Sequence, residues 1–293
     1  MTPEDFEFLS GAIKKQSGLV LTKEKAYLLD SRLMPVARAH LLKDLEELVK
    51  SLRVNPGGAL MEKVTEAMTT NESFFFRDIK PFALFRDYVL PQLIEKRAAT
   101  KTIRIWCAAA ANGQEPYSLA IILKEEARKL AGWSKQILGT DISREVLEKA
   151  KKGLYTQFEV QRGLSIQQLV AHFQKQGDMW SIDPSLKAMV QYKKFNLLDD
   201  LGPLGAFDVV FCRNVLIYFD AETKTRVLDG ISKRMPDDGM LFLGGAETVL
   251  GITDKFKPVA GRRGVYCLAG AGGGESLPKA PKAGAQGVSI TAG

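Results

Sequence analysis

From about residue 101 onward, short apolar runs alternate with segments of helical periodicity, and this alternation limits the possible folds more than any other feature of the chain. Strands are expected over residues 102–107, 136–140, 207–212, 240–244 and 264–268, with a further short strand ending near Phe195. Helices are expected over residues 114–130, 143–152 and 221–234. Strands that alternate with helices predict an α/β domain with a mostly parallel sheet and helices on both faces.

The first 70 residues, by contrast, show only helical patterns. Thr2 is expected to cap the first helix, Pro3 to begin it and Gly18 to end it. A later helix is expected to begin after Asp44, and the sequence NPGG at 55–58 separates it from the next. This part of the chain is therefore expected to be a small helical domain.

The two patterns define the domain boundaries. We expect a helical domain over residues 1–70, a linker over 71–100 and an α/β domain over 101–269. Residues 153–195 interrupt the alternation and are expected to form a small inserted subdomain. Residues 270–293 contain seven glycines and little that could form a core, so a disordered tail is expected there.

The composition narrows the class of protein. The chain has 293 residues, of which 45% are hydrophobic, an ordinary globular composition. Its three cysteines are isolated and lack metal-ligand spacing, which favours free thiols in a reducing compartment and no metal site. The acidic start, MTPED, does not resemble a signal peptide, and no apolar run approaches the roughly 18 residues that span a bilayer. We therefore expect a cytoplasmic protein that does not insert into the membrane.

Small or polar residues follow four of the expected strands. They are Ala108 to Gly113 after the first strand, Asp141 after the second, Asn196 and Leu197 after the third, and Asn214 and Val215 after the fourth. In doubly wound sheets, ligands bind beyond the carboxyl ends of the strands. A ligand site is therefore expected where these residues meet.

The turn after the first strand lacks the Gly-x-Gly-x-x-Gly pattern of a dinucleotide site, because only Gly113 remains. Glu115 stands at the start of the next helix, where a carboxylate would repel a pyrophosphate. It is compatible with a cationic ligand or with ribose hydroxyls. The alternative is that Glu115 only complements the helix dipole.

Two further residues have a functional and a structural interpretation. Asp141 follows a strand, where a carboxylate can accept hydrogen bonds from both hydroxyls of a ribose, or it can cap the helix that begins near Ser143. Asn214 can bind an adenine edge or the amino-acid end of a ligand, or it can be a turn residue.

The sequence TTNESFFFRD at 69–78 is the second unusual feature. Three consecutive phenylalanines do not fit one amphipathic face, so at least one must pack off the axis. Periodicity alone favours a capped helix from Ser73 with a buried aromatic patch, which would place Arg77 one turn onward.

Six ordered segments resemble the motifs of the CheR-type chemotaxis protein methyltransferases. They are TTNESFFFRD, RIWCAAAANGQEPYSLA, ILGTDIS, NLL at 196–198, FDVVFCRNVLIYFD and FLGGAET. The resemblance covers residues 1 to about 268. It implies a Rossmann-like, class I fold that binds S-adenosylmethionine, with an all-helical N-terminal domain and a small inserted β-subdomain.

The resemblance also implies roles for individual residues, and it replaces the capped-helix interpretation of the Phe-rich segment. Cofactor-binding positions are expected at Asn71, Ser73, Arg77, Ala108, Glu115, Asp141, Asn196, Leu197, Asn214 and Val215. Arg77 and Tyr218 are the candidate catalytic residues. Arg77 can orient the acceptor carboxylate or close over the cofactor, and Tyr218 can line the acceptor site or serve only in packing.

The chain departs from the family pattern at three places. Ser73 stands where threonine is common, and it keeps the hydroxyl. Ala111-Asn112 replaces a frequent Ser-Thr, which puts one cofactor contact in doubt. The segment between Phe173 and Asn196 is short, resembling members that do not need a receptor C-terminal pentapeptide as a tether.

The implied activity is methyl transfer from S-adenosylmethionine to glutamate side chains of bacterial chemoreceptors, leaving S-adenosylhomocysteine. An ionised carboxylate needs no strong base, so the enzyme is expected to contribute positioning and partial desolvation, worth up to about 7–11 kcal/mol. Residues 11–43 carry seven Lys or Arg against two acidic residues. Lys25, Arg32 and Arg38 are therefore candidates for binding the acidic methylation helices of receptors, or they form an ordinary solvated surface.

Two other functions fit parts of the sequence. The net charge of +7 also suits nucleic acid, but a nucleic-acid methyltransferase would need a motif such as Asp/Asn-Pro-Pro-Tyr/Phe where this chain has Arg213-Asn214-Val215-Leu216. A non-catalytic scaffold that binds S-adenosylmethionine is the other alternative. We expect an enzyme that acts as a monomer and does not bind nucleic acid.

Overall fold

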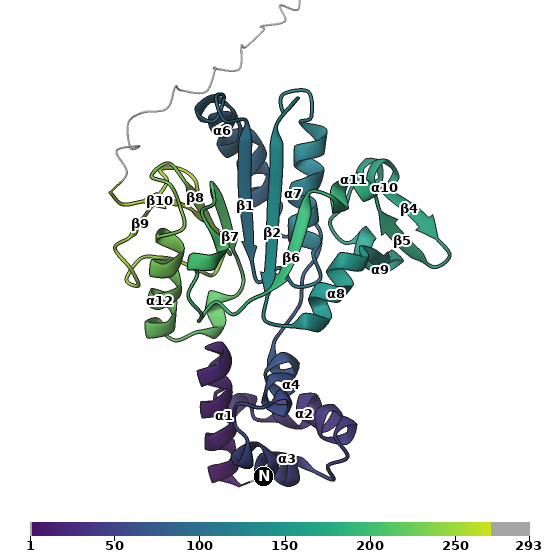
Figure 1. The fold of residues 1–293 in the computed structure, drawn as a ribbon, viewed down its shortest axis with the longest axis vertical. Helices are drawn as coiled ribbons and strands as arrows, with labels where there is room; N and C mark the ends of the chain where they lie inside the picture. The colour runs from purple at the N-terminus through teal and green to yellow at the C-terminus, as the bar shows by residue number, and fades with distance from the viewer. Residues whose placement is uncertain (1, 271–293) are drawn as a thin grey trace, which may run out of the picture.

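The alternating pattern forms a seven-stranded mixed sheet, and the helical segments form a separate domain at one end of it (Figure 1). The computed structural model describes residues 2–270. The strand order is β6-β2-β1-β7-β8-β10-β9. The strands are β1 Thr102–Ala108, β2 Ser134–Asp141, β6 Val190–Lys194, β7 Val209–Cys212, β8 Met240–Leu243, β9 Phe256–Pro258 and β10 Val265–Leu268. The pairs from β6 to β8 are parallel, whereas β10 is antiparallel to both β8 and β9.

Strand β1 shows why the sheet needs helices on both faces. Ile103, Ile105 and Cys107 pack on one face in a core with α5, α6 and α7, and Trp106 and Ala108 pack on the other face in a core with α12. All five residues are fully buried, as expected of a central parallel strand. The helices are α5 Lys80–Leu84, α6 Leu90–Lys96, α7 Gln114–Glu125, α8 Arg144–Lys152 and α12 Ala221–Ser232, with a π-helical turn η2 at Phe85–Val89 and 3-10 turns η3 Gly202–Leu204 and η4 Leu216–Tyr218.

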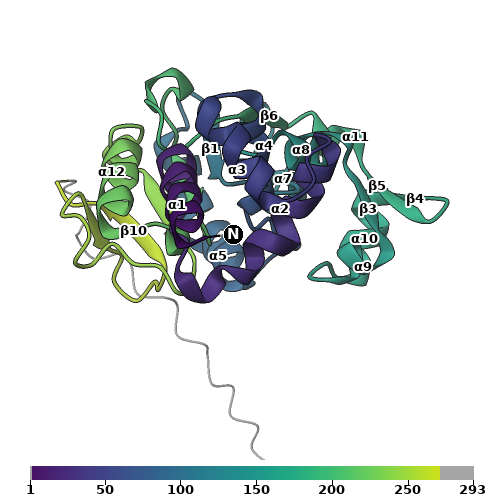
Figure 2. The same ribbon diagram turned by 90° about the horizontal axis from the view of Figure 1, so that it is seen from below.

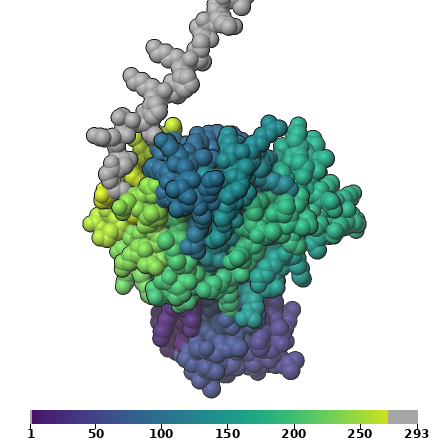
Figure 3. Space-filling view, turned by 45° about the horizontal axis from the view of Figure 1, so that its top comes forward, coloured from purple at the N-terminus to yellow at the C-terminus, as the bar shows by residue number. Residues whose placement is uncertain are grey.

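The N-terminal domain consists of four helices around their own apolar core. They are α1 Pro3–Ser17, α2 Tyr27–Ala39, α3 Leu45–Val54 and α4 Ala59–Met68, with a 3-10 turn η1 at Lys23–Lys25 before α2. The predicted caps are confirmed: Thr2 and Asp5 form a reciprocal capping box, Gly18 ends α1 with φ 78°, and Asp44 accepts from the Glu47 N–H. Figure 3 shows this domain as a lobe below the larger one.

The inserted subdomain interrupts the α/β pattern between α8 and β6. Its small antiparallel sheet has the order β3-β5-β4. The elements are β3 Leu154–Thr156, α9 Gln157–Gln161, α10 Ile166–His172, β4 Phe173–Gln176, β5 Met179–Ile182 and α11 Pro184–Lys187. Seen from below in Figure 2, it projects to one side, away from α1 and α12. The region 153–195 is therefore only partly an insertion, because β6 belongs to the main sheet.

Two expectations differ from the structure, and a third falls outside it. The helix predicted to reach residue 130 ends at Glu125, because residues 126–129 offer only Ala127 as an apolar side chain. The predicted linker over 71–100 is extended or turn-like only to residue 79. Beyond it, α5, η2 and α6 bury Phe82, Phe85 and further apolar residues against the sheet. The tail expected over residues 270–293 lies outside the described residues, apart from Gly270.

Candidate functional site

A pocket of about 920 Å³, including the space open to solvent at its mouth, lies between the carboxyl ends of four parallel strands and the helical domain. Residues that follow β1, β2, β6 and β7 form its walls on the side of the sheet. The helical domain and the segment after it contribute Ser17, Leu19, Thr69 and Thr70. The sheet thus provides the strand-end site expected of this topology, and the helical domain completes it.

Ten of the predicted site residues line this one pocket. They are Asn71, Ser73, Arg77, Glu115, Asp141, Asn196, Leu197, Asn214, Val215 and Tyr218. Ala108 does not line it: its side chain is fully buried in the core on the α12 face of the sheet. The alanines that line the pocket are Ala109 and Ala111, because the backbone turns into the left-handed region after β1 ends.

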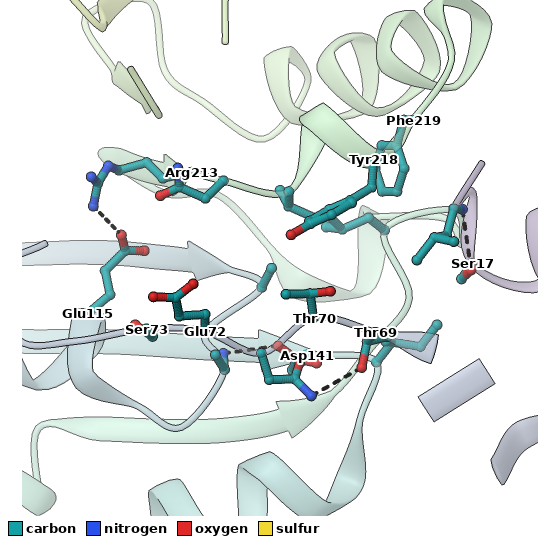
Figure 4. Close-up of a pocket in the computed structure, with 18 of the residues that line it drawn as sticks. Ser17, Thr69, Thr70, Glu72, Ser73, Glu115, Asp141, Arg213, Tyr218 and Phe219 are labelled. Carbon is teal, nitrogen blue, oxygen red and sulfur yellow. Dashed lines mark hydrogen bonds and ion pairs between the residues drawn. The ribbon is translucent and has the colours of Figure 1, made fainter. Parts of the chain in front are cut away.

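Asp141, the last residue of β2, lies in the middle of the pocket (Figure 4). Its Oδ2 accepts from the Ala111 N–H and its Oδ1 from the Ser143 N–H, both at 3.0 Å. One carboxylate therefore fixes the loops after β1 and β2, while the N-cap of α8 is Ser143 and not Asp141. Burial raises the pKa of Asp141, and the two backbone hydrogen bonds lower it in part.

The loop after β1 brings its backbone close to the pocket. Ala109, Ala111 and Gly113 all have positive φ values, of 64°, 46° and 87°. A Cβ at Gly113 would lie 2.6 Å from the Tyr192 hydroxyl and 2.8 Å from the Ala150 Cβ, so this position requires glycine. The Tyr155 hydroxyl, from β3 of the inserted subdomain, donates to the Asn112 carbonyl at 2.9 Å. The loop is thus held in one strained conformation by the elements packed against it.

Glu115, in the first turn of α7, is buried at one side of the pocket. Its Oε2 accepts from Arg213 Nη1 at 2.8 Å, and Figure 4 shows this pair at the side opposite Ser17 and Phe219. Burial raises the pKa of Glu115, and the Arg213 charge counteracts this rise. The position at the start of α7, where a dinucleotide would place its pyrophosphate, is therefore occupied by a carboxylate.

The Phe-rich segment is not the capped helix that periodicity favours. Residues 71–74 have no regular secondary structure and 75–78 form turns, and the three phenylalanine rings contact different surroundings. Phe75 packs edge-on against Tyr155 and Phe173 of the inserted subdomain, and Phe76 packs against Phe82. Phe74 lies beneath the guanidinium of Arg162, 4.1 Å from its ring centroid. The expectation that at least one ring packs off-axis is confirmed.

Three arginines from three parts of the molecule hold this segment. Arg32 of α2 donates to the carbonyls of Met68 and Thr69 and to the Thr70 hydroxyl. Arg162 of the inserted subdomain pairs with Glu72 at 2.9 Å. Arg213 of the sheet donates to the carbonyl of Arg77 and pairs with the carboxylate of Asp78. The strip over residues 68–78 is therefore tied to all three parts that surround the pocket.

Arg77 and Tyr218, the candidate catalytic residues, both line the pocket. Arg77 Nη1 donates to the Glu72 carbonyl at 2.7 Å. Tyr218 ends η4, and its backbone carbonyl accepts from the Val20 N–H of the helical domain at 2.9 Å. In Figure 4 its hydroxyl points toward the middle of the pocket.

Two asparagines that line the pocket are hydrogen-bonded to residues outside the pocket lining. Asn196 Nδ2 donates to the Gln16 carbonyl at the end of α1, at 2.6 Å, so the helical domain is bound directly to this wall. Asn214 adopts φ 58°, and its N–H donates to Glu247. Asn214 thus has the left-handed backbone of a turn residue, and it also lines the pocket.

Glu247 supports the pocket wall, and it is a residue that the sequence did not single out. The residue is buried, and its carboxylate accepts from the backbone N–H groups of Gly244, Asn214 and Val215 at 2.7–2.9 Å, and of Ile217 at 3.3 Å. One side chain therefore shapes the whole loop that carries Asn214, Val215 and Tyr218. The signal was present in the FLGGAET motif, but nothing in that motif indicates which backbone groups its glutamate binds.

The basic residues expected to bind an acidic partner separate into two groups. Lys25 and Arg38 are exposed on the helical domain, away from the pocket lining. Arg32 is half-buried, and its guanidinium is used inside the molecule to hold residues 68–70. Arg32 therefore stabilises the segment that borders the pocket, whereas Lys25 and Arg38 form the exposed basic surface.

Ion pairs also join the helical domain to the sheet. Lys194, at the end of β6, pairs with Glu62 and with Glu66 of α4, and Glu66 accepts from the Arg144 N–H at the start of α8. On the other side of the pocket, Lys14 of α1 pairs with Asp220 before α12, at 2.7 Å. The two domains are therefore fixed on both sides of the pocket that they share.

These features define the class of protein. The sheet order, the strand-end carboxylate and the carboxylate in place of a pyrophosphate site fit S-adenosylmethionine, which carries a ribose and a cationic amino-acid end but no phosphate. Within the described residues, no group of His, Cys, Asp or Glu is arranged to hold a metal ion, and no helix is long and apolar enough to cross a membrane. The chain has the fold and the site of a Rossmann-like, S-adenosylmethionine-dependent methyltransferase.

Comparison with known proteins identifies the family. Residues 71–265 match the SAM-binding domain of the CheR methyltransferases, and residues 4–69 match their all-alpha domain. The chain is 39% identical over 259 residues to chemotaxis protein methyltransferase Cher2 of Pseudomonas putida, covering 87% of this chain and 94% of that protein. Chemotaxis protein methyltransferase 1 of Pseudomonas aeruginosa is 40% identical over the same shares of both chains. The chain belongs to the CheR methyltransferase family, and it is a S-adenosylmethionine-dependent chemotaxis protein methyltransferase.

Proposed function

We propose that this enzyme methylates glutamate side chains of bacterial chemoreceptors, forming methyl esters on their cytoplasmic methylation helices. The observation that carries the proposal is the joint pocket. The all-helical domain characteristic of the chemotaxis methyltransferases lines the donor site through Ser17 and Leu19, and the same domain carries the exposed basic residues Lys25 and Arg38. An acidic acceptor that binds the helical domain would therefore lie next to the donor.

Different pocket residues would bind different parts of the donor. Asp141 would accept from the ribose hydroxyls, and Asn196, Leu197, Asn214 and Val215 would contact the adenine and methionine portions. The bound donor supplies an electrophilic methyl group on a sulfonium. Glu115 and Arg77 carry the opposite charges that suit an ammonium and a carboxylate at the amino-acid end.

The acceptor requires little chemical activation. A glutamate carboxylate is already ionised at neutral pH, so one of its oxygens can attack the methyl carbon in line while the bond to sulfur breaks. No proton is transferred, and the products are the methyl ester and S-adenosylhomocysteine. The protein contributes by aligning the two groups and by removing water from the carboxylate, which is a poor nucleophile when hydrated.

Arg77 and Tyr218 are the residues that would act closest to this step. Arg77 is bonded to the Glu72 carbonyl in the strip over 68–78, so we assign it to the donor side and to closing the pocket. A tight ion pair between Arg77 and the acceptor would weaken the nucleophile. Tyr218 has its hydroxyl in the pocket, and we assign it to positioning the acceptor carboxylate.

Charge reversal on the helical domain should separate acceptor binding from donor binding. Replacing Lys25 or Arg38 by glutamate is expected to lower kcat/KM on receptor membranes by about 5- to 10-fold at low salt, because steering by the basic surface is lost. The loss should shrink at high salt, and the affinity for S-adenosylmethionine should not change.

The matched control is Lys233→Glu, which reverses an exposed charge at the far end of α12 from the helical domain. It should leave kcat/KM unaltered. If the Lys233 and Arg38 variants lowered kcat/KM equally, the rate would depend on the net charge of the protein and not on the basic surface of the helical domain.

The acceptor is tested by transfer of a radiolabelled methyl group to membranes that contain chemoreceptors, followed by release of the label in mild base. Label that is released by base and requires the receptors supports the proposal. Label in RNA, or in base-stable form, contradicts it. We further propose that the enzyme acts in the cytoplasm as a monomer and needs no C-terminal receptor tether, so receptors lacking their last residues should be methylated at the same rate.

A further inference from the structure

Arg213, the first residue after β7, lines the pocket but is not among the cofactor-binding residues that the resemblance implies. Its side chain is almost completely buried, and it joins three segments through one guanidinium. Nη1 donates to Glu115 at 2.8 Å, and Nη2 donates to the Arg77 carbonyl at 3.0 Å and to Asp78 at 2.6 Å. The buried Nε has no partner among the described residues.

The turn that Arg213 holds is strained. Phe76, Asp78 and Ile79 all have positive φ values, of 51°, 68° and 52°, although none of them is glycine. Such conformations cost free energy and persist only where the surroundings enforce them. The contacts that enforce this turn include the Ser118 hydroxyl, which accepts from the Phe76 N–H, and the two Arg213 bonds to Arg77 and Asp78.

Arg213 therefore fixes two groups of opposite charge on one side of the pocket. It holds the carboxylate of Glu115 directly, and it holds Arg77 through the backbone of the turn. The amino-acid end is the only part of S-adenosylmethionine that carries both an ammonium and a carboxylate. A lysine could not make these contacts, because it presents one ammonium group where arginine presents a planar fork.

We propose that Arg213 is a positioning residue for the amino-acid end of the donor, holding Glu115 and Arg77 at the spacing that this end requires. The inference rests on the proposed function only in its assignment of Glu115 and Arg77 to that end of the donor. It predicts that Arg213 affects recognition of the amino-acid end and leaves recognition of the nucleoside almost unchanged.

The test compares two ligands by calorimetry on the full-length enzyme. S-adenosylhomocysteine carries the amino-acid end, and methylthioadenosine lacks it. In Arg213→Lys the affinity for S-adenosylhomocysteine should fall by about 10-fold or more, the size of one lost charge-assisted hydrogen bond. The affinity for methylthioadenosine should change by no more than about 2-fold, because Asp141 and the other nucleoside contacts remain. The preference for S-adenosylhomocysteine over methylthioadenosine is the readout.

Asp78→Asn is the second variant, since Asp78 is half-exposed and its replacement should not prevent folding. It should lower the same preference in the same direction by a smaller factor. The matched control is Arg97→Lys, which alters another partly buried arginine network, with Asp208 and Asp238, away from the pocket lining. This control should lower stability to urea and leave the preference unchanged.

An equal loss of affinity for both ligands in Arg213→Lys and Asp78→Asn would overturn the inference, because it would show a purely structural role. An unchanged preference in both variants would overturn it as well. The proposed function is tested separately: a wild-type enzyme that shows the ligand preference but does not methylate receptor glutamates would contradict the acceptor and leave the role of Arg213 intact.

Discussion

Replacing Asp141 by alanine is expected to weaken binding of S-adenosylmethionine by about 100-fold or more. In the binding mode that we propose, the change would remove two charge-assisted hydrogen bonds to the ribose, each worth about 1.5–3 kcal/mol. It also leaves the N–H groups of Ala111 and Ser143 without their partner, so the loops after β1 and β2 lose a common support. Calorimetric titration with S-adenosylmethionine and with S-adenosylhomocysteine measures the loss.

Asp183→Ala is the control for Asp141→Ala. Asp183 also accepts a backbone N–H, from Ser185, but it lies before α11 in the inserted subdomain. Its loss should cost stability and leave donor affinity unchanged. A donor affinity within a few-fold of wild type in Asp141→Ala would show that Asp141 does not hold the ribose.

The raised pKa of Asp141 gives this residue a pH signature. Its carboxylate takes up a proton at a higher pH than an ordinary aspartate, because burial disfavours the charged form. A protonated Asp141 is a poorer acceptor, so donor affinity should fall as the pH is lowered through this pKa. Asp141→Asn should bind weakly at all pH values and should lack that part of the decline, which titrations at several pH values below neutral can measure.

Replacing Glu247 by glutamine is expected to destabilise the fold by about 2–5 kcal/mol and to weaken donor binding as well. Four backbone N–H groups point at the two carboxylate oxygens, and an amide would present a donor to some of them. Each buried donor left without an acceptor costs about 1–3 kcal/mol. The loop that carries Asn214, Val215 and Tyr218 should then lose its conformation. Urea denaturation and donor titration measure the two effects.

Glu159→Gln provides a comparison for Glu247→Gln. Glu159 also accepts a backbone N–H, from Thr156, but it does so in a capping box of the inserted subdomain, far from the pocket lining. It should cost about 1 kcal/mol of stability or less and leave donor affinity intact. If Glu247→Gln were no more harmful than Glu159→Gln, the four hydrogen bonds would not be what shapes the loop.

Much of the fold was readable from the sequence because it depends on local signals. The alternation of apolar runs and helices predicted the parallel part of the sheet, and the caps at Thr2, Gly18 and Asp44 predicted three helix ends. The antiparallel strand β9 was missed because Phe256–Pro258 is too short to show a period. The helices over 80–96 were missed because their apolar spacing was assigned to a linker.

The sequence predicted which residues share the pocket better than it predicted which groups their side chains contact. Topology brings together the residues that follow parallel strands, so Glu115, Asp141 and Asn214 were expected to share a pocket. Ala108 was also expected there, but its side chain points into the core on the α12 face, and the pocket lining begins one residue later, at Ala109. The internal role of Arg32 could not be inferred, since its partners are two backbone carbonyls and a threonine hydroxyl that lie 36 to 38 residues away.

The proposed acceptor is tested most directly by locating the added methyl group. Receptor membranes are incubated with the enzyme and limiting S-adenosylmethionine, digested, and analysed by tandem mass spectrometry, with the Asp141→Ala enzyme as the control of weakened donor affinity. We predict one added methylene on glutamate side chains within the cytoplasmic helices of the receptors, abundant with wild type and strongly reduced with Asp141→Ala. Methyl groups on lysine, on nucleic acid, or on glutamates in equal amount with both enzymes would contradict the account.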